Sequence, residues 1–177
     1  VRWDSPDKGV LAPYKFIPIA EETNMILPLG EWIIKNACKI NKKFQDEGCK
    51  KVPIAINISA KQFEQDDIVK IISDALKDAN LDPKYLELEL TESILMKNYK
   101  NTIQKLNTLK SIGIKLSIDD FGTGYSSLSY LKMFPIDTLK IDRSFISNLS
   151  TGSADDSSIA SLVIDLGHAL GMNVIAE

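Results

Sequence analysis

Oxygen-bearing side chains and one lysine recur in this sequence where short apolar runs end. In chain order they are Asn57, Glu89 with Glu92, Asp119 with Asp120, Lys140 with Asp142, and Glu177. Carboxylates that converged at one place would repel one another unless cations compensated them, which favours hard divalent metals such as Mg²⁺ or Mn²⁺. Two such ions would activate a water and stabilise charge on a phosphoryl group. Lys140 would add a fixed positive charge beside the attacked phosphate or the activated water.

An ordinary role explains any single one of these carboxylates as well as catalysis does, because strand ends and helix caps often carry acids. The whole set is harder to explain in that way, since its members follow successive apolar runs. Other metal chemistries are excluded by composition. The one histidine, His168, and the two cysteines, Cys38 and Cys49, do not make a paired-histidine site or a Cys/His zinc cluster.

The elements that must position these residues follow from the hydrophobic pattern. Helical spacing predicts helices over 29–44, 68–79, 103–112 and 159–170, and short apolar runs predict strands over 52–59, 85–90, 114–118, 138–141 and 173–176. Strict alternation of strands and helices is typical of an α/β fold with a parallel sheet.

Alternate residues of a strand point to opposite faces of the sheet, and the residue types on these two faces distinguish two kinds of parallel sheet. Leu86, Leu88 and Leu90 share one face, while Glu87 and Glu89 share the other, and the other strands repeat this split. A doubly wound sheet buries both faces and would be apolar on both. We therefore predict a TIM-like (β/α) barrel with a polar interior. A half-solvated antiparallel sheet would show the same alternation, but the intervening helices count against it.

The length predicts that this barrel is incomplete. A complete (β/α)₈ barrel takes about 250 residues, whereas the chain has 177. We expect the first strands and the last strand to be missing, which leaves two sheet edges unpaired.

The residues after the third predicted strand form a polar loop. Asp119 to Leu128 is Asp-Asp-Phe-Gly-Thr-Gly-Tyr-Ser-Ser-Leu. Its glycines and serines would let backbone N–H groups approach a phosphate. The glycine spacing is not that of a P-loop, and a plain strand-to-helix loop explains the segment equally well.

Composition and charge narrow the functional classes further. The chain is 44% hydrophobic and 25% charged, with 21 basic and 24 acidic residues and a net charge of −3. This balance is typical of a soluble globular protein and gives no general surface for a nucleic-acid polymer. No run of about 18 apolar residues is present, although a longer parent protein could still be membrane-anchored. Two unpaired thiols favour a cytoplasmic location.

Six segments together resemble one family. They are residues 1–3, 16–21, 57–59, 89–93, 119–128 and 139–145, and they include Asn57-Ile58-Ser59, Glu89-Leu90-Thr91-Glu92-Ser93 and Leu139-Lys140-Ile141-Asp142. The chain resembles the EAL-domain cyclic di-GMP phosphodiesterases over its full length. The resemblance implies a TIM-like barrel that hydrolyses cyclic di-GMP to linear pGpG with two Mg²⁺ or Mn²⁺ ions. Residues 1–177 would then be a partial EAL phosphodiesterase domain.

The resemblance also assigns roles to individual residues. Asn57, Glu89, Asp119 and Asp120 match metal ligands. Lys140 matches the lysine beside the catalytic water, Glu177 a catalytic or metal-site glutamate, and Glu92 the glutamate that anchors the loop after Asp120. Arg2 and Asp142 are expected to contact the dinucleotide.

The family pattern extends past both ends of the sequence, so alternatives stay open. The Glu-Ala-Leu tripeptide is expected just before Val1, and a second glutamate after Glu177, so we expect the 177 residues alone to be inactive. A binding module that senses cyclic di-GMP without cleaving it is the main rival, and an idle interaction scaffold is another. Because every metal-site residue in view is retained, we favour the enzyme, as a homodimer with sensor or diguanylate-cyclase-like domains in the parent chain.

Overall fold

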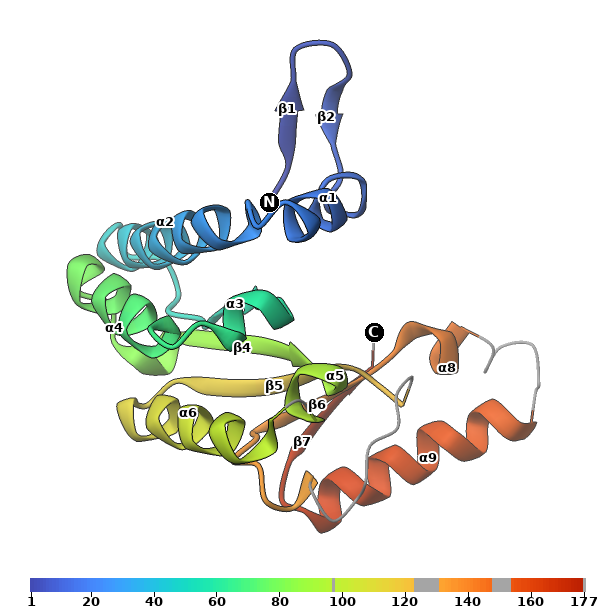
Figure 1. Ribbon diagram of the computed structural model, residues 1–177. Helices are drawn as coiled ribbons and strands as arrows, with labels where there is room; N and C mark the ends of the chain where they lie inside the picture. Colours follow the sequence, from blue (N-terminus) through green and yellow to red (C-terminus); the bar gives the residue numbers. More distant parts are fainter. Residues whose placement is uncertain (97, 123–130, 148–153, 177) are drawn as a thin grey trace. The chain divides into compact units, whose positions relative to one another are not determined.

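The computed structural model describes residues 1–96, 98–122, 131–147 and 154–176 (Figure 1). The chain divides into two compact units. The first comprises Val1–Lys51 with Ile58–Leu81, and the second comprises Val52–Asn57 with Asp82–Glu177. Among the described residues, no helix is both long and apolar enough to cross a membrane.

The second unit is built on one parallel sheet. Its strands are β3 (Ile54–Asn57), β4 (Leu86–Thr91), β5 (Lys115–Phe121), β6 (Thr138–Ile141) and β7 (Asn173–Ala176), in the spatial order β3-β4-β5-β6-β7. Each strand therefore pairs with the strand that follows it in the chain. A doubly wound sheet reverses its order at a switch point, and this sheet does not. Sequential winding is that of a (β/α) barrel, so the second unit is an incomplete TIM-like barrel, as the strand parity predicted.

Two long helices, α6 (Tyr99–Ile112) and α9 (Ala154–Ala169), cover the apolar face of this sheet. The second unit also contains the short helices α5 (Glu92–Met96), after β4, and α8 (Arg143–Ser147), after β6, with the 3₁₀ turn η2 (Pro83–Tyr85) before β4. Helices α6 and α9 lie on the same side of the sheet (Figure 1). Helix α6 ends at Ile112 because Gly113 adopts a left-handed φ of 103°, which closes the helix.

The core between sheet and helices contains the apolar residues of each strand. Leu86, Leu88, Leu90, Leu116, Ile118 and Leu139 are fully buried. Leu106 and Leu109 of α6 are also fully buried. The opposite parity carries Glu89, Ser117 and Lys140, so burying the apolar face turns these polar side chains to the other face.

At the amino-terminal side of the sheet, Asp137 ties neighbouring strands together. Its carboxylate accepts hydrogen bonds from Lys110 Nζ, at 2.6 and 2.8 Å, and from the Leu116 backbone N–H at 2.8 Å. Its own backbone N–H donates to the Leu116 carbonyl, and its carbonyl accepts from the Asn173 N–H. One residue thus links β5, the start of β6 and β7.

The first unit combines a hairpin with helices. Strands β1 (Trp3–Ser5) and β2 (Gly9–Leu11) pair antiparallel, and the helices are η1 (Pro13–Lys15), α1 (Ile17–Glu22), α2 (Ile26–Asp46), α3 (Ala60–Glu64) and α4 (Ile68–Ala79). The rings of Trp3 and Phe16 meet edge to face, with centroids 6.0 Å apart. The sequence pattern had not predicted this hairpin.

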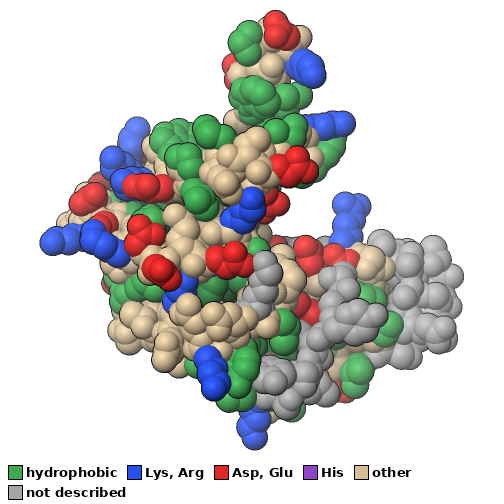
Figure 2. Space-filling view, in the orientation of Figure 1, with side chains coloured by type: hydrophobic (Ala, Val, Ile, Leu, Met, Phe, Trp, Pro, Cys, Tyr) green, Lys and Arg blue, Asp and Glu red, His purple; other side chains and the backbone are tan. Residues whose placement is uncertain are grey.

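Helices α2 and α4 pack against each other through their apolar faces. Ile34 and Cys38 of α2 are fully buried, as is Ile72 of α4. On the outer surface, Lys or Arg side chains alternate with Asp or Glu (Figure 2), and pairs such as Lys35–Glu31 join residues four apart. Each exposed pair of this kind stabilises its helix only slightly.

Candidate active site

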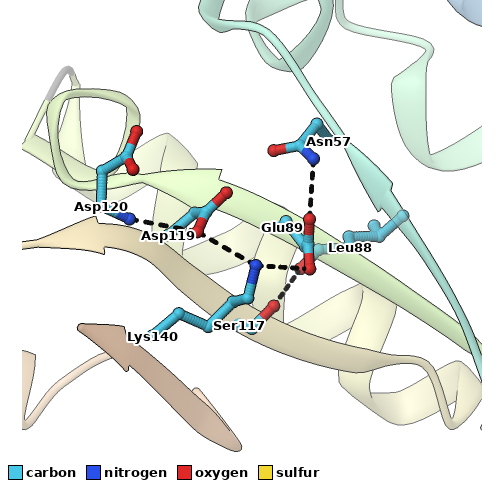
Figure 3. A network of polar contacts seen from close by, with 7 residues as sticks. All are labelled: Asn57, Leu88, Glu89, Ser117, Asp119, Asp120 and Lys140. Atoms are coloured by element: carbon cyan, nitrogen blue, oxygen red, sulfur yellow. Dashed lines mark hydrogen bonds and ion pairs between the residues drawn. The ribbon is translucent and has the colours of Figure 1, made fainter. Parts of the chain in front are cut away.

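Four polar side chains from four adjacent strands form one network at the carboxyl ends of β3 to β6 (Figure 3). Lys140 Nζ lies 2.9 Å from Glu89 Oε1 and 3.1 Å from Asp119 Oδ1. Asn57 Nδ2 donates to Glu89 Oε2 at 2.7 Å. The strand register explains this meeting, because Asn57 stands directly opposite Glu89 and both share one face of the sheet.

The charged members of the network are buried. The exposed fractions are 8% for Glu89, 9% for Asp119 and 9% for Lys140. Charged side chains are almost never buried to this degree unless they are paired. Two carboxylates and one ammonium leave this trio with one excess negative charge, which a bound cation would compensate.

A β-bulge aims the two consecutive aspartates. Ile118 pairs with Leu139 and Phe121 pairs with Ile141, so Asp119 and Asp120 together stand opposite the single residue Lys140. Asp120 adopts a left-handed φ of 52°. In a regular strand the two side chains would point to opposite faces, but a bulge re-aims one of them. Figure 3 shows both carboxylates on the same side of the strand.

Asp142 follows β6 directly and faces Asp120. The Asp142 carboxylate accepts hydrogen bonds from the Ser144 backbone N–H, at 2.8 Å, and from the Ser144 hydroxyl. These bonds from Ser144, with a smaller contribution from Asp120, hold the pKa of Asp142 below its ordinary value. Asp142 is therefore ionised at neutral pH.

Glu92 lies at the start of α5, directly after β4, and is 5% exposed. Its Oε1 accepts a hydrogen bond from the Gly122 backbone N–H at 2.6 Å. The segment after Asp120 is thereby tied to the end of β4.

Ser117 is a member of the site that the sequence analysis did not single out. Ser117 is fully buried and lies on the same face of β5 as Asp119. Its hydroxyl donates to the Leu88 carbonyl at 3.4 Å. Its parity was the available signal, since a small polar residue on the polar face of a barrel strand points to the interior.

The donor set fits a hard divalent cation. Amide and carboxylate oxygens of Asn57, Glu89, Asp119 and Asp120 are the ligand types that Mg²⁺ and Mn²⁺ prefer. The ammonium of Lys140 already lies between two of these carboxylates, where positive charge is stabilised. Among the residues that the structure describes, no three side chains of the types His, Cys, Asp and Glu are grouped closely enough to hold a metal ion by themselves.

The structure does not test the roles expected of Arg2 and Glu177. Arg2 belongs to the first unit, where it is exposed and its Nη1 donates to the Val1 carbonyl at 2.8 Å. Glu177 and residues 123–130, which include most of the Gly/Ser-rich loop, lie outside the described residues. Their roles stay predictions.

Two relatives align in sequence with all 177 residues of the chain. It is 46% identical over 177 residues to the signaling protein YkoW of Bacillus subtilis. It is 42% identical over 177 residues to MucR of Pseudomonas aeruginosa, which is named a bifunctional diguanylate cyclase/cyclic di-GMP phosphodiesterase. The chain spans only 22% and 26% of the lengths of these two relatives.

A solved structure matches the fold. The "PaMucR Phosphodiesterase, c-di-GMP complex" aligns with a TM-score of 0.94 at 41% identity, over 99% of this chain and 70% of that chain. The sequence model of the EAL domain matches residues 1–177, the full chain. The chain therefore belongs to the EAL domain family.

Proposed function

We propose that this protein hydrolyses cyclic di-GMP to linear pGpG with Mg²⁺ or Mn²⁺ bound at the acidic cluster. The observation that carries the proposal is the buried network in which Lys140 contacts both Glu89 and Asp119 at the carboxyl ends of the strands. Active sites of (β/α) barrels are built at this end of the sheet. The name of MucR and its solved complex with cyclic di-GMP support the choice of substrate.

The residues that would hold the metal are Asn57, Glu89, Asp119 and Asp120. Two bound divalent ions would lower the pKa of an attacking water and offset charge on the phosphoryl group. The chain supplies the fixed positions of these oxygens, because three adjacent strands and one bulge set them before any ligand arrives. Such preorganisation lowers the barrier without reorganisation during the reaction.

The reaction replaces one phosphodiester bond with one bond to water. The water oxygen bonds to a phosphorus atom, and the bond from that phosphorus to the ribose 3′ oxygen breaks, which leaves a 5′-phosphate on pGpG. The positive charge of Lys140 would stabilise the negative oxygens of the phosphoryl group. Its two carboxylate partners hold the ammonium in place.

The resemblance to the family supports three further assignments. We propose that Arg2 and Asp142 contact the dinucleotide and that Glu177 acts in catalysis. Glu92 would act through Gly122, whose N–H it accepts, and is therefore a positioning residue.

We propose that residues 1–177 are part of the phosphodiesterase domain of a homodimeric cytoplasmic protein. The two free thiols, Cys38 and Cys49, suit a reducing compartment. Sensor or diguanylate-cyclase-like domains would accompany the domain, as the bifunctional name of MucR illustrates for that relative.

A matched pair of variants of the full-length protein tests the proposal. Asp119→Asn removes one charge from the network, whereas Asp78→Asn removes one charge from the exposed surface of α4. We expect Asp119→Asn to lower the rate of pGpG formation at least about a hundredfold and Asp78→Asn to leave it unchanged, as followed by chromatography. Wild-type protein that binds cyclic di-GMP and forms no pGpG in either metal would instead be a sensor.

A further inference from the structure

The turn that ends β5 has an uncommon backbone. Asp120 adopts a φ of 52° and Gly122 a φ of 103°, so two of three consecutive residues lie in the left-handed region. A residue with a side chain keeps such a conformation only where its surroundings impose it. The position of the Asp119 and Asp120 carboxylates therefore depends on whatever holds this turn.

Polar contacts restrain the backbone groups of the turn. The Asp120 N–H donates to Asp119 Oδ1 at 3.2 Å, and the Gly122 N–H donates to Glu92 at 2.6 Å. The Phe121 carbonyl accepts the Asp142 N–H at 3.5 Å. These bonds fix N–H and C=O groups, but they leave the Cα of Gly122 without a polar restraint.

An aromatic ring supplies the missing contact. A Cβ placed on Gly122 would lie 3.3 Å from Phe145 Cζ and only 2.8 Å from Phe145 Cε2, and the second distance is closer than real Cβ atoms approach. The ring of Phe145, on helix α8, therefore packs directly on the Cα of Gly122. Glycine has the widest choice of backbone conformations of any residue, so without this ring the turn has a hinge two residues from Asp120.

We propose that Phe145 is a positioning residue for the phosphodiesterase reaction. Its ring presses on Gly122 and keeps the bulge at Asp119 and Asp120 in the geometry that places the Asp119 carboxylate beside Lys140 and turns the Asp120 carboxylate to the same side of the strand. Glu92 holds the same glycine through its N–H. The importance of Phe145 for catalysis rests on the proposed function, whereas its effect on the turn does not.

Hydrogen exchange of the metal-free, substrate-free full-length protein tests the effect on the turn. Mass spectrometry with fragmentation would follow the amides of Leu116–Gly122. We expect Phe145→Ala to speed exchange at Gly122 at least about tenfold. Phe145→Leu keeps most of the apolar bulk, so it should restore part of the protection, and it serves if the alanine variant does not fold. Ile146→Ala is the matched control, since Ile146 is the next residue on α8 and is also half-buried.

Steady-state kinetics test the consequence for catalysis. We expect Phe145→Ala to lower kcat about tenfold to a hundredfold, because small misplacements of catalytic groups cost this much, while KM changes little. Combined with Glu92→Gln, the two losses should be less than multiplicative, since both residues hold Gly122.

The outcomes are separable. The proposal is overturned if hydrogen exchange at Gly122 is unchanged in Phe145→Ala, or if Ile146→Ala accelerates it equally. It is also overturned if Phe145→Ala shows faster exchange but a normal kcat. Absence of hydrolysis by the wild type overturns the proposed function, and the exchange data then decide the role of Phe145 in the turn alone.

Discussion

Lys140 Nζ lies 2.9 Å from Glu89 Oε1, although Lys140 is on β6, Glu89 is on β4, and β5 runs between them. Neighbouring strands are about 4.8 Å apart, so the two side chains meet above the intervening strand. Ser117 of β5 stands opposite Glu89 in the register and is small enough to leave this space (Figure 3). The ion pair therefore depends on a small residue at position 117.

Replacing Ser117 with valine tests that dependence. The branched side chain would enter the space between Glu89 and Lys140, so we expect kcat for cyclic di-GMP to fall at least about tenfold and the free energy of unfolding to fall by about 1–3 kcal/mol. Ser117→Ala is the control, because it removes only a 3.4 Å hydrogen bond to the Leu88 carbonyl. Equal activity of the two variants would show that the space above β5 is unimportant.

Lys140→Met separates metal binding from catalysis. The lysine ammonium competes with a cation for Glu89 and Asp119, so its removal should strengthen Mn²⁺ binding several-fold, as measured by calorimetry. The same change should lower kcat at least about a hundredfold, since a fixed charge near the phosphate is lost.

The control for Lys140→Met is Lys84→Met. Lys84 is exposed on η2, before β4 begins, and its removal should alter neither quantity. A Lys140→Met protein with weaker Mn²⁺ binding would mean that the lysine helps to build the metal site instead of competing for it.

Asp137→Ala should destabilise the fold without touching the active site. It leaves the Leu116 N–H and the Lys110 ammonium without their acceptor, which costs about 1–3 kcal/mol in urea unfolding. Lys110→Met keeps the bond to Leu116 and should cost less. Because Asp137 lies at the end of the sheet away from the catalytic groups, kcat at 25 °C should stay within about twofold for both variants.

The parallel sheet could be predicted because its strands alternate strictly between apolar and polar residues. Strands β6 and β7 begin and end at the predicted residues, 138–141 and 173–176. Helices α1, α3, α5 and α8 have only five or six residues each. Such segments are too short to show a helical period. The hairpin β1–β2 was not predicted either, because strands of three residues are too short to show an alternating pattern.

The active-site network could be predicted only in part. Strand parity grouped Asn57, Glu89 and Asp119 on one face, and these residues do share a network with Lys140. The alternation of a regular strand predicts that Asp120 points to the other face, and an Asp-Asp pair carries no sequence signal for a bulge. The contact of Phe145 with Gly122 depends on where α8 lies after β6, which no local pattern encodes.

Stability at alkaline pH should depend on Cys38. Burial raises the pKa of Cys38 from 9.0 to about 11. Below pH 9 the thiol is protonated in both states, but as the pH rises through the window from 9 to 11 the unfolded thiol ionises first, so stability falls. Between pH 8 and 10.5, the wild type should lose about 2 kcal/mol more in urea unfolding than Cys38→Ala does. Cys49→Ala, at an exposed thiol, should behave like the wild type. Equal losses in wild type and Cys38→Ala would mean that the folded thiol ionises normally.

Cleavage of cyclic di-GMP by the cluster of Asn57, Glu89, Asp119 and Lys140 with a divalent metal can be tested on the reaction itself. The most direct measurement is a time course of the purified full-length protein with cyclic di-GMP, in which chromatography separates the cyclic substrate from linear products. We expect pGpG as the product in Mg²⁺ or Mn²⁺, no product in EDTA, and recovery of hydrolysis when metal is added back. Hydrolysis at the same rate in EDTA, or no hydrolysis in either metal by protein that binds the dinucleotide, would contradict this expectation.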